Sequence, residues 1–208
     1  MQTKTLVDKG PYPSVEKFLA RHVEMQFADL RAMLRLPTEE LQGGCNFAAT
    51  AVLMNLISGF SVCLYNANLG NTRDRGNRFN VMLNTYYPWQ VGGEVNSDAE
   101  GSKKLYEFWR NPLAHRLGIH LGKEWIGIGK SPLTASQIEE LEASATPPGS
   151  LRMNPTGPTF IRETTQLEPS TMLSVPGLYW GTWRLLTKLC QDRTQMATAG
   201  KVLKAQGF

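Results

Sequence analysis

The 208-residue sequence has only three cysteines, Cys45, Cys63 and Cys190, and no two of them have the Cys-x-x-Cys spacing. An odd number of scattered cysteines is not typical of a disulfide framework, so we expect reduced thiols. Three histidines without a recognisable spacing to each other or to the cysteines do not indicate a zinc site. The sequence also lacks Gly-x-Ser-x-Gly, His-Glu-x-x-His and complete phosphate-loop patterns. We therefore expect no metal and no cofactor.

Two further absences bear on location. The first ten residues are polar and charged and do not resemble a signal peptide, so we expect a cytoplasmic protein with no membrane association. Residues 41–71 contain no charged residue, and the part from Cys45 to Tyr65 is apolar with scattered polar residues. Its length would permit a transmembrane span. The internal polar residues and Gly59 favour instead the buried central helix of a bundle.

The overall composition is that of a folded, soluble protein, with 41% hydrophobic and 19% charged residues. The formal net charge of +4 tolerates a polyanionic partner without demanding one. The positive excess gathers in two stretches. From Tyr179 onward, five cations oppose only Asp192: Arg184, Lys188, Arg193, Lys201 and Lys204. The second group includes Arg73, Arg75, Arg78, Lys103, Lys104, Arg110 and Arg116. Solvated helix faces are the alternative explanation for both.

Hydrophobic periodicity predicts a mainly α protein in a single domain over residues 1–208. We expect a helical bundle over residues 14–122, a last helix at 178–199 and a small β-containing insertion around 124–176. Ser14 is expected to cap the first helix, and Thr134 with Gln137 has the capping-box spacing. Short strands are expected at residues 125–129, 150–154 and 159–165, because these segments alternate in polarity or are bounded by turn residues.

One segment combines residues suited to phosphate chemistry. Arg110 and His115 lie five positions apart across Asn111-Pro112, within an apolar and aromatic pattern. Cleavage of RNA without a metal needs a group that moves a proton and a group that stabilises charge on the phosphoryl oxygens. Histidine and arginine suit these two tasks. On an unbroken helix this spacing would separate the side chains by roughly 140°. Because Pro112 disfavours an unbroken helix, Arg110 is expected to end one helix, with Asn111 as a cap and a second helix starting or resuming at Leu113.

The sequence from Arg110 to His115 resembles the HEPN superfamily motif, in which a polar residue directly follows the arginine and a histidine lies a few residues further on. The resemblance implies an HEPN-like all-α bundle that forms a homodimer, with the motifs of both protomers facing one cleft. It also implies metal-independent endoribonuclease activity that leaves 2′,3′-cyclic phosphate ends, in defence or toxin-like systems. Arg110 would hold the scissile phosphate, His115 would move the proton, and Asn111 would orient the pair. The segment from Trp125 to Pro176 has no counterpart in the minimal family fold.

We expect RNA as the partner, with Arg116, Lys103 and Lys104 as further nucleic-acid-binding residues beside the motif. A protein antitoxin or regulatory subunit is a further candidate partner. Two alternatives stay open at this point. Arg110 and His115 could be purely structural, with Arg110 paired to Glu107. The bundle could also be a non-catalytic module that binds a nucleotide, a nucleic acid or a protein.

Overall fold

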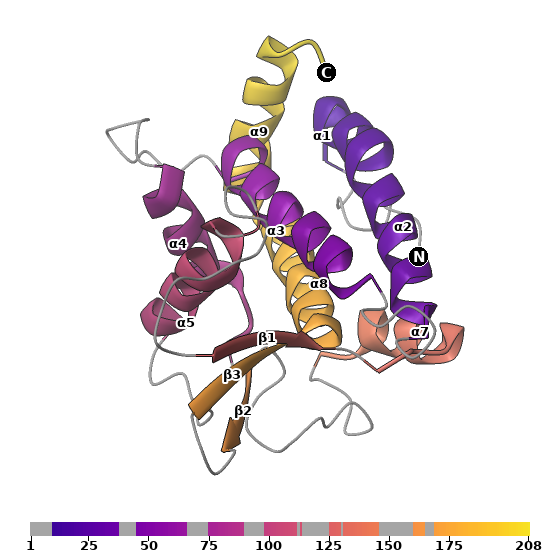
Figure 1. Ribbon diagram of the computed structural model, residues 1–208. Helices are drawn as coiled ribbons and strands as arrows, with labels where there is room; N and C mark the ends of the chain where they lie inside the picture. The colour runs from indigo at the N-terminus through magenta and orange to yellow at the C-terminus, as the bar shows by residue number, and fades with distance from the viewer. Residues whose placement is uncertain are drawn as a thin grey trace.

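The computed structural model describes residues 10–37, 45–65, 75–89, 98–111, 113, 125–129, 131–145, 160–164 and 169–208. The described chain is mainly helical, as the sequence predicts. Two central helices, α3 (Asn46–Cys63) and α8 (Val175–Gln191), pack against each other. Figure 1 shows α1 and α2 on one side of this pair and α4 and α5 on the other. The fold is therefore a helical bundle, which carries a small sheet at one end of α8.

The first helix runs without interruption from α1 (Pro13–Phe18) through a π-helical turn, η2 (Leu19–Val23), into α2 (Glu24–Arg35). The prediction that Ser14 caps this helix is wrong. Pro13 occupies the first turn, where its fixed φ and missing N–H are tolerated. The Ser14 hydroxyl instead donates a hydrogen bond to the carbonyl of Gly200, at 2.9 Å.

Helix α4 (Arg75–Tyr86) buries the predicted apolar side chains Phe79, Met82 and Leu83. It packs against α5 (Asp98–Lys104), which continues as a second π-helical segment, η3 (Leu105–Arg110). The core between the central pair and α2 is aromatic. The ring of Phe27 meets those of Tyr179 and Trp183 edge to face, with centroids 5.6 and 4.8 Å apart. Edge-to-face packing of this kind adds to the stabilisation that ring burial provides.

Among the described residues, α3 is the one helix long and apolar enough to cross a membrane by length and composition. Half of that span is buried, and α3 contacts α2, α4 and α8 within the bundle. A central helix that is enclosed in this way needs an apolar surface on several sides. Its packing thus accounts for the apolar residues on the buried half of this span, whereas Phe47 and Val62 of the same helix are exposed.

Three strands form a sheet of order β1-β3-β2. β1 (Trp125–Gly129) pairs in parallel with β3 (Pro169–Ser174), and β2 (Phe160–Thr164) pairs with β3 in the antiparallel sense. The strands expected at 125–129 and 159–165 are thus confirmed, whereas β3 was not predicted. The strand expected at 150–154 lies outside the described residues. Helix α7 (Ala135–Ala143) begins with the predicted capping box, since Thr134 and Gln137 exchange hydrogen bonds of 3.3 and 2.8 Å.

The prediction of one continuous last helix at residues 178–199 is wrong. The chain forms α8 and then α9 (Arg193–Ala205), with a break at Asp192. The Asp192 carboxylate accepts hydrogen bonds from the backbone N–H of Gln195 at 3.1 Å and from the hydroxyl of Tyr86 at 2.7 Å. Aspartate is a favoured N-terminal cap, and the tyrosine on α4 fixes it in place. The chain therefore leaves α8 at Gln191 and begins α9 at Arg193.

Candidate functional site around Arg110

Four of the candidate site residues lie in the described part of the chain. Lys103 and Lys104 end α5, Arg110 ends η3, and Asn111 follows directly. The backbone N–H of Asn111 donates to the carbonyl of Tyr106, five residues earlier, so the last turn of η3 is wider than an α-helical turn. Isolated π turns of this kind occur frequently at functional sites. As predicted, η3 ends at Arg110 with Asn111 at its C-cap position, where the backbone keeps helical dihedral angles (φ −67°, ψ −48°). Leu113 is also helical.

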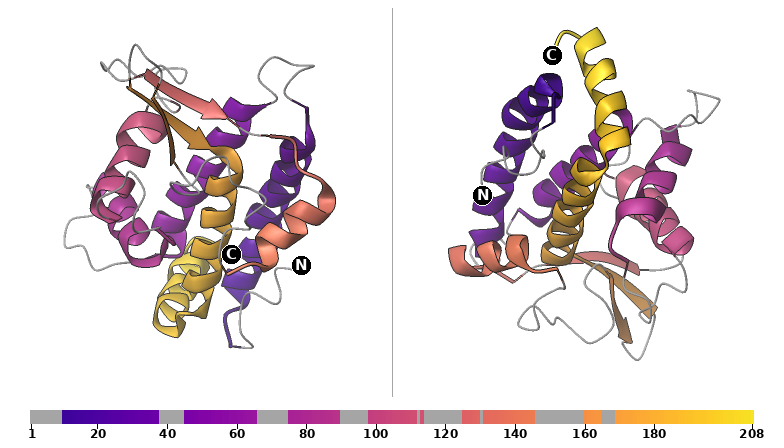
Figure 2. Two further views of the ribbon diagram at one scale, coloured as in Figure 1. Left: turned by 90° about the horizontal axis from the view of Figure 1, so that it is seen from below. Right: turned by 180° about the vertical axis from the view of Figure 1, so that it is seen from behind.

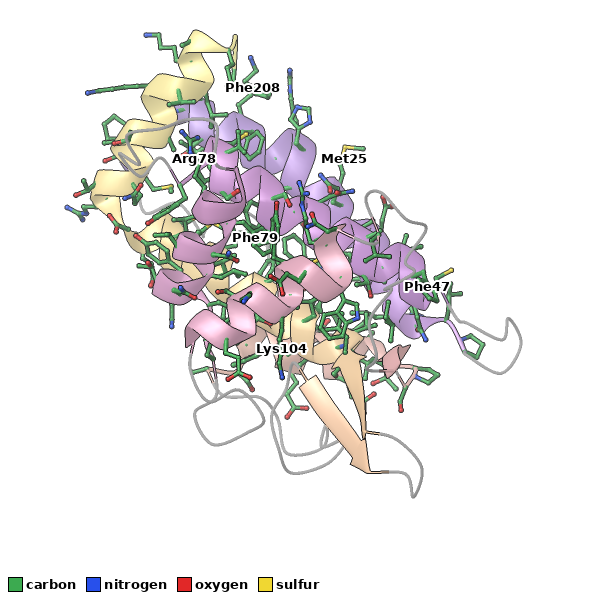
Figure 3. All side chains as sticks on the ribbon, turned by 60° about the vertical axis from the view of Figure 1, so that its left-hand side comes forward. Met25, Phe47, Arg78, Phe79, Lys104 and Phe208 are labelled. Carbon is green, nitrogen blue, oxygen red and sulfur yellow. The ribbon has the colours of Figure 1, made fainter. Side chains whose placement is uncertain are left out.

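The guanidinium group of Arg110 is held by two neighbours. Its Nη1 atom donates a hydrogen bond to Oδ1 of Asn111 at 3.0 Å, and its Cζ atom lies 5.3 Å from the ring centroid of Tyr106. The Tyr106 ring packs edge to face against Phe79 of α4, with centroids 5.5 Å apart. Figure 3 marks Phe79 on α4 and Lys104 on α5 in this part of the bundle. A half-buried cation is therefore positioned on an aromatic support.

The carboxylates near Arg110 have other partners. Within the described part of the chain, no carboxylate oxygen lies within 4.0 Å of the Arg110 guanidinium. Glu107, which the structural alternative paired with Arg110, instead lies 4.0 Å from Nζ of Lys103. Arg110 thus keeps a positive charge that no described acidic side chain neutralises. Its remaining guanidinium N–H groups suit a bidentate contact with an oxyanion.

Lys103 and Lys104 each pair with a glutamate four residues away, Lys103 with Glu107 and Lys104 with Glu100 at 3.4 Å. Surface pairs of this kind contribute little to stability and exchange partners easily. Lys103 is exposed, whereas Lys104 is partly buried beside α4. His115 and Arg116 lie outside the described residues, so the structure gives no distance between Arg110 and His115.

No group of three histidine, cysteine or acidic side chains arranged to bind a metal occurs among the residues that the structure describes. Cys63 and Cys190 do not resemble nucleophiles. Burial raises the pKa of Cys190 to about 12 and raises that of Cys63, which keeps both thiols protonated near neutral pH.

A buried polar cluster around Glu142 on α7 was not predicted from the sequence. The Glu142 side chain is 7% exposed, and its Oε1 atom accepts hydrogen bonds from Nε of Arg31 at 2.8 Å and from the hydroxyl of Tyr179. Burial is the main cause that raises the pKa of Tyr179, so this hydroxyl stays protonated and donates. Arg31 also contacts Oε1 of Glu24 at 3.0 Å. These contacts tie α2, α7 and α8 together.

The backbone carbonyl of Glu142 also takes part in hydrogen bonds. The carbonyl of Glu142 accepts hydrogen bonds from the indole N–H of Trp183, at 3.2 Å, and from the guanidinium of Arg184. The sequence did contain a signal. Glu142 lies four residues after Ile138 and directly after Leu141, so it shares the apolar side of α7 with two buried residues. Because its Oε1 atom accepts hydrogen bonds from both Arg31 on α2 and Tyr179 on α8, this carboxylate serves to hold helices together.

No family model matches the chain, and no curated protein and no solved structure matches it either. The resemblance to the HEPN superfamily therefore rests on the residues from Arg110 to His115 and on the helical bundle that carries them.

Proposed function

We propose that this protein is a metal-independent endoribonuclease of the HEPN type, with Arg110, His115 and Asn111 as its catalytic residues. The observation that carries the proposal is the state of Arg110. Its guanidinium is oriented by Asn111 and Tyr106, and no described carboxylate lies within 4.0 Å of it. An oriented, half-buried guanidinium without an acidic neighbour is suited to take an oxyanion as its partner.

The chemistry would require two groups acting at one phosphodiester. The 2′-hydroxyl attacks phosphorus as its proton passes to a base, and the 5′-oxygen of the next nucleotide leaves with a proton, which gives a 2′,3′-cyclic phosphate. His115 is the candidate for proton transfer, because an imidazole titrates near neutral pH. Arg110 would stabilise the charge that develops on the phosphoryl oxygens. Asn111 would hold the guanidinium in place.

Two features accompany this proposal. A homodimer would bring two copies of the Arg110 segment to one cleft, and the protein would act on RNA in the cytoplasm. Lys103, Lys104 and Arg116 would contact phosphates beside the scissile one, and their salt-sensitive attraction would raise the affinity for RNA.

The test is cleavage of a labelled single-stranded RNA in the presence of a chelator. We expect 2′,3′-cyclic phosphate products from the unmodified protein and none from Arg110→Ala or His115→Ala. Arg35→Ala, which removes an exposed cation on α2, serves as the matched control and is expected to cleave normally. Cleavage that survives both motif substitutions would overturn the proposal. Binding of RNA without any cleavage would also overturn it, and would favour a non-catalytic RNA-binding module.

A further inference from the structure

Helices α1 and α9, which lie far apart in the sequence, pack against each other. The Ser14 hydroxyl donates a hydrogen bond to the carbonyl of Gly200 at 2.9 Å. Residues that flank the two helices add contacts, since the Tyr12 hydroxyl donates to the carbonyl of Arg193 at 3.4 Å and the Phe208 ring lies 5.2 Å from that of His22. Figure 2 shows the two helices adjacent at one end of the bundle in its right-hand view.

Three aromatic rings lie along this seam. Phe18 and His22 stack with centroids 5.8 Å apart and planes inclined by 27°. The Phe208 ring meets both edge to face, at 5.6 and 5.2 Å (Figure 3 labels Phe208). His22 is exposed, and Phe18 and Phe208 are half-buried. Solvent therefore reaches a continuous aromatic surface built from two helices.

Four exposed cations flank these rings. Lys17 and Arg21 lie directly before Phe18 and His22 and occupy the solvent side of the first helix. On α9, Lys204 lies one turn beyond Gly200 and therefore on the edge that faces α1, with Lys201 on the adjoining solvent side. No carboxylate among the described residues lies within 4.0 Å of these four side chains.

Acidic side chains are nearly absent from these two helices. Residues 193–208 include no aspartate or glutamate. The acidic residue of α1 is Glu16, two positions before Phe18 and thus roughly 200° around the helix from it. The face formed by Lys17, Phe18, Arg21, His22, Lys201, Lys204 and Phe208, which we call the α1–α9 face, is thus cationic and aromatic at once.

We propose that the α1–α9 face binds single-stranded RNA, and the choice of RNA rests on the proposed function. Unpaired bases stack on exposed rings while neighbouring phosphates contact cations, which matches a seam of rings with cations on both sides. A duplex would offer phosphates but keep its bases stacked on each other. Figure 1 shows α1 and α9 at the end of the bundle away from the sheet, with α5 lower down on the side of α4, so the face would hold a part of the RNA away from the segment that carries Arg110.

Binding is best measured by fluorescence anisotropy with a labelled single-stranded oligoribonucleotide and full-length protein that carries Arg110→Ala, so that cleavage does not interfere. We expect Lys17→Glu with Lys204→Glu to weaken binding at least tenfold. Loss of two phosphate contacts should also reduce the slope of log affinity against log salt by about 1.4. The control, Arg35→Glu with Lys188→Glu, changes the net charge equally at exposed cations outside the face and is expected to bind within about twofold.

The aromatic part is tested separately. We expect His22→Ala with Phe208→Leu to weaken binding of the single strand about fivefold or more, with little change in the salt slope. Equal losses in the charge variant and its control would overturn the proposal, and so would unchanged affinity in the face variants. Tighter binding to a duplex of equal length, or to vesicles of anionic lipid through the same residues, would also overturn it.

The two proposals fail in different ways. If the unmodified protein binds RNA through the α1–α9 face but cuts none, the catalytic proposal is wrong and the binding surface stands. If it cuts RNA while both face variants bind and cleave normally, the binding surface is wrong and the catalytic proposal stands.

Discussion

Asn111 accepts a hydrogen bond from Arg110 through Oδ1 at 3.0 Å, so adjacent residues in the chain fix each other's side chains at the end of η3. This contact lets a flexible arginine present its guanidinium in one orientation, with the Tyr106 ring beneath it. Preorganisation of this kind is what a group that stabilises transition-state charge requires.

The first prediction concerns Arg110→Lys, which keeps the charge but removes the planar fork and its stacking on Tyr106. We expect the single-turnover cleavage rate to fall about 100-fold. Asn111→Leu keeps the charge of the Arg110 guanidinium but removes the hydrogen bond that orients it. We expect the cleavage rate to fall less, by about tenfold. Lys188→Ala, an exposed change on α8, is the control and should leave the rate unchanged. An Arg110→Lys rate equal to that of the unmodified protein would show that charge alone suffices.

The second prediction concerns the buried carboxylate of Glu142. Glu142→Gln leaves the half-buried Arg31 without its main counter-charge and should lower the free energy of unfolding by about 3 kcal/mol. Glu140→Gln removes an exposed carboxylate from the same helix and should change it by less than about 0.5 kcal/mol. Denaturant titration measures both. Similar midpoints for the two variants would contradict the structural role assigned to Glu142.

The third prediction compares two helical glycines. An added Cβ at Gly181 would lie 2.1 Å from the hydroxyl oxygen of Tyr87 and 2.2 Å from its Cζ atom, whereas at Gly59 it would meet nothing within 4 Å. We expect Gly181→Ala to destabilise the protein by about 2–3 kcal/mol through overpacking. We expect Gly59→Ala to stabilise it by about 0.5–1 kcal/mol, because alanine favours a helix. Thermal unfolding of the two variants would reveal shifts of opposite sign. A destabilised Gly59→Ala protein would indicate that this side of α3 is covered.

The fourth prediction concerns pH and the contact between Tyr86 and Asp192. The hydrogen bond from Tyr86, followed by the N–H of Gln195, holds the pKa of Asp192 below its usual value of 3.8. A lowered native pKa means that Asp192 contributes stability above pH 3.8, and that this contribution is lost as the pH falls through the native value. Tyr86→Phe should therefore destabilise the protein by about 1 kcal/mol at neutral pH and by less in acid. Unfolding curves of the unmodified protein and Tyr86→Phe at several pH values measure the difference in stability. A difference that stays constant from neutral pH into acid would contradict the prediction.

Much of the fold follows from local pattern. The helices of the bundle have an apolar face at helical spacing, as at Phe79, Met82 and Leu83, and Thr134 with Gln137 has a complete capping signal. Such features depend only on residues within a few positions of each other. They could therefore be predicted from the sequence alone.

The features that could not be predicted depend on distant partners. Asp192 breaks the last helix, and its carboxylate is bonded to Tyr86 on α4. β3 has little alternation of its own and pairs with two strands from earlier in the chain. Ser14 bonds to Gly200, 186 residues away. For the candidate site, the sequence identified Arg110 and Asn111, but the mutual hydrogen bond and the support from Phe79 through Tyr106 needed three-dimensional packing.

The π turns at η2 and η3 have a consequence for how the chain tolerates insertions and deletions. A π turn is equivalent to one residue inserted into an α-helix, and it shifts the phase of all that follows by roughly 100°. Removal of one residue from η3 would let the helix close regularly and would rotate Arg110 relative to Tyr106. The same change in η2 would rotate His22 away from Phe208. Each proposed RNA contact therefore depends on the length of one helical turn as much as on the identity of its side chains.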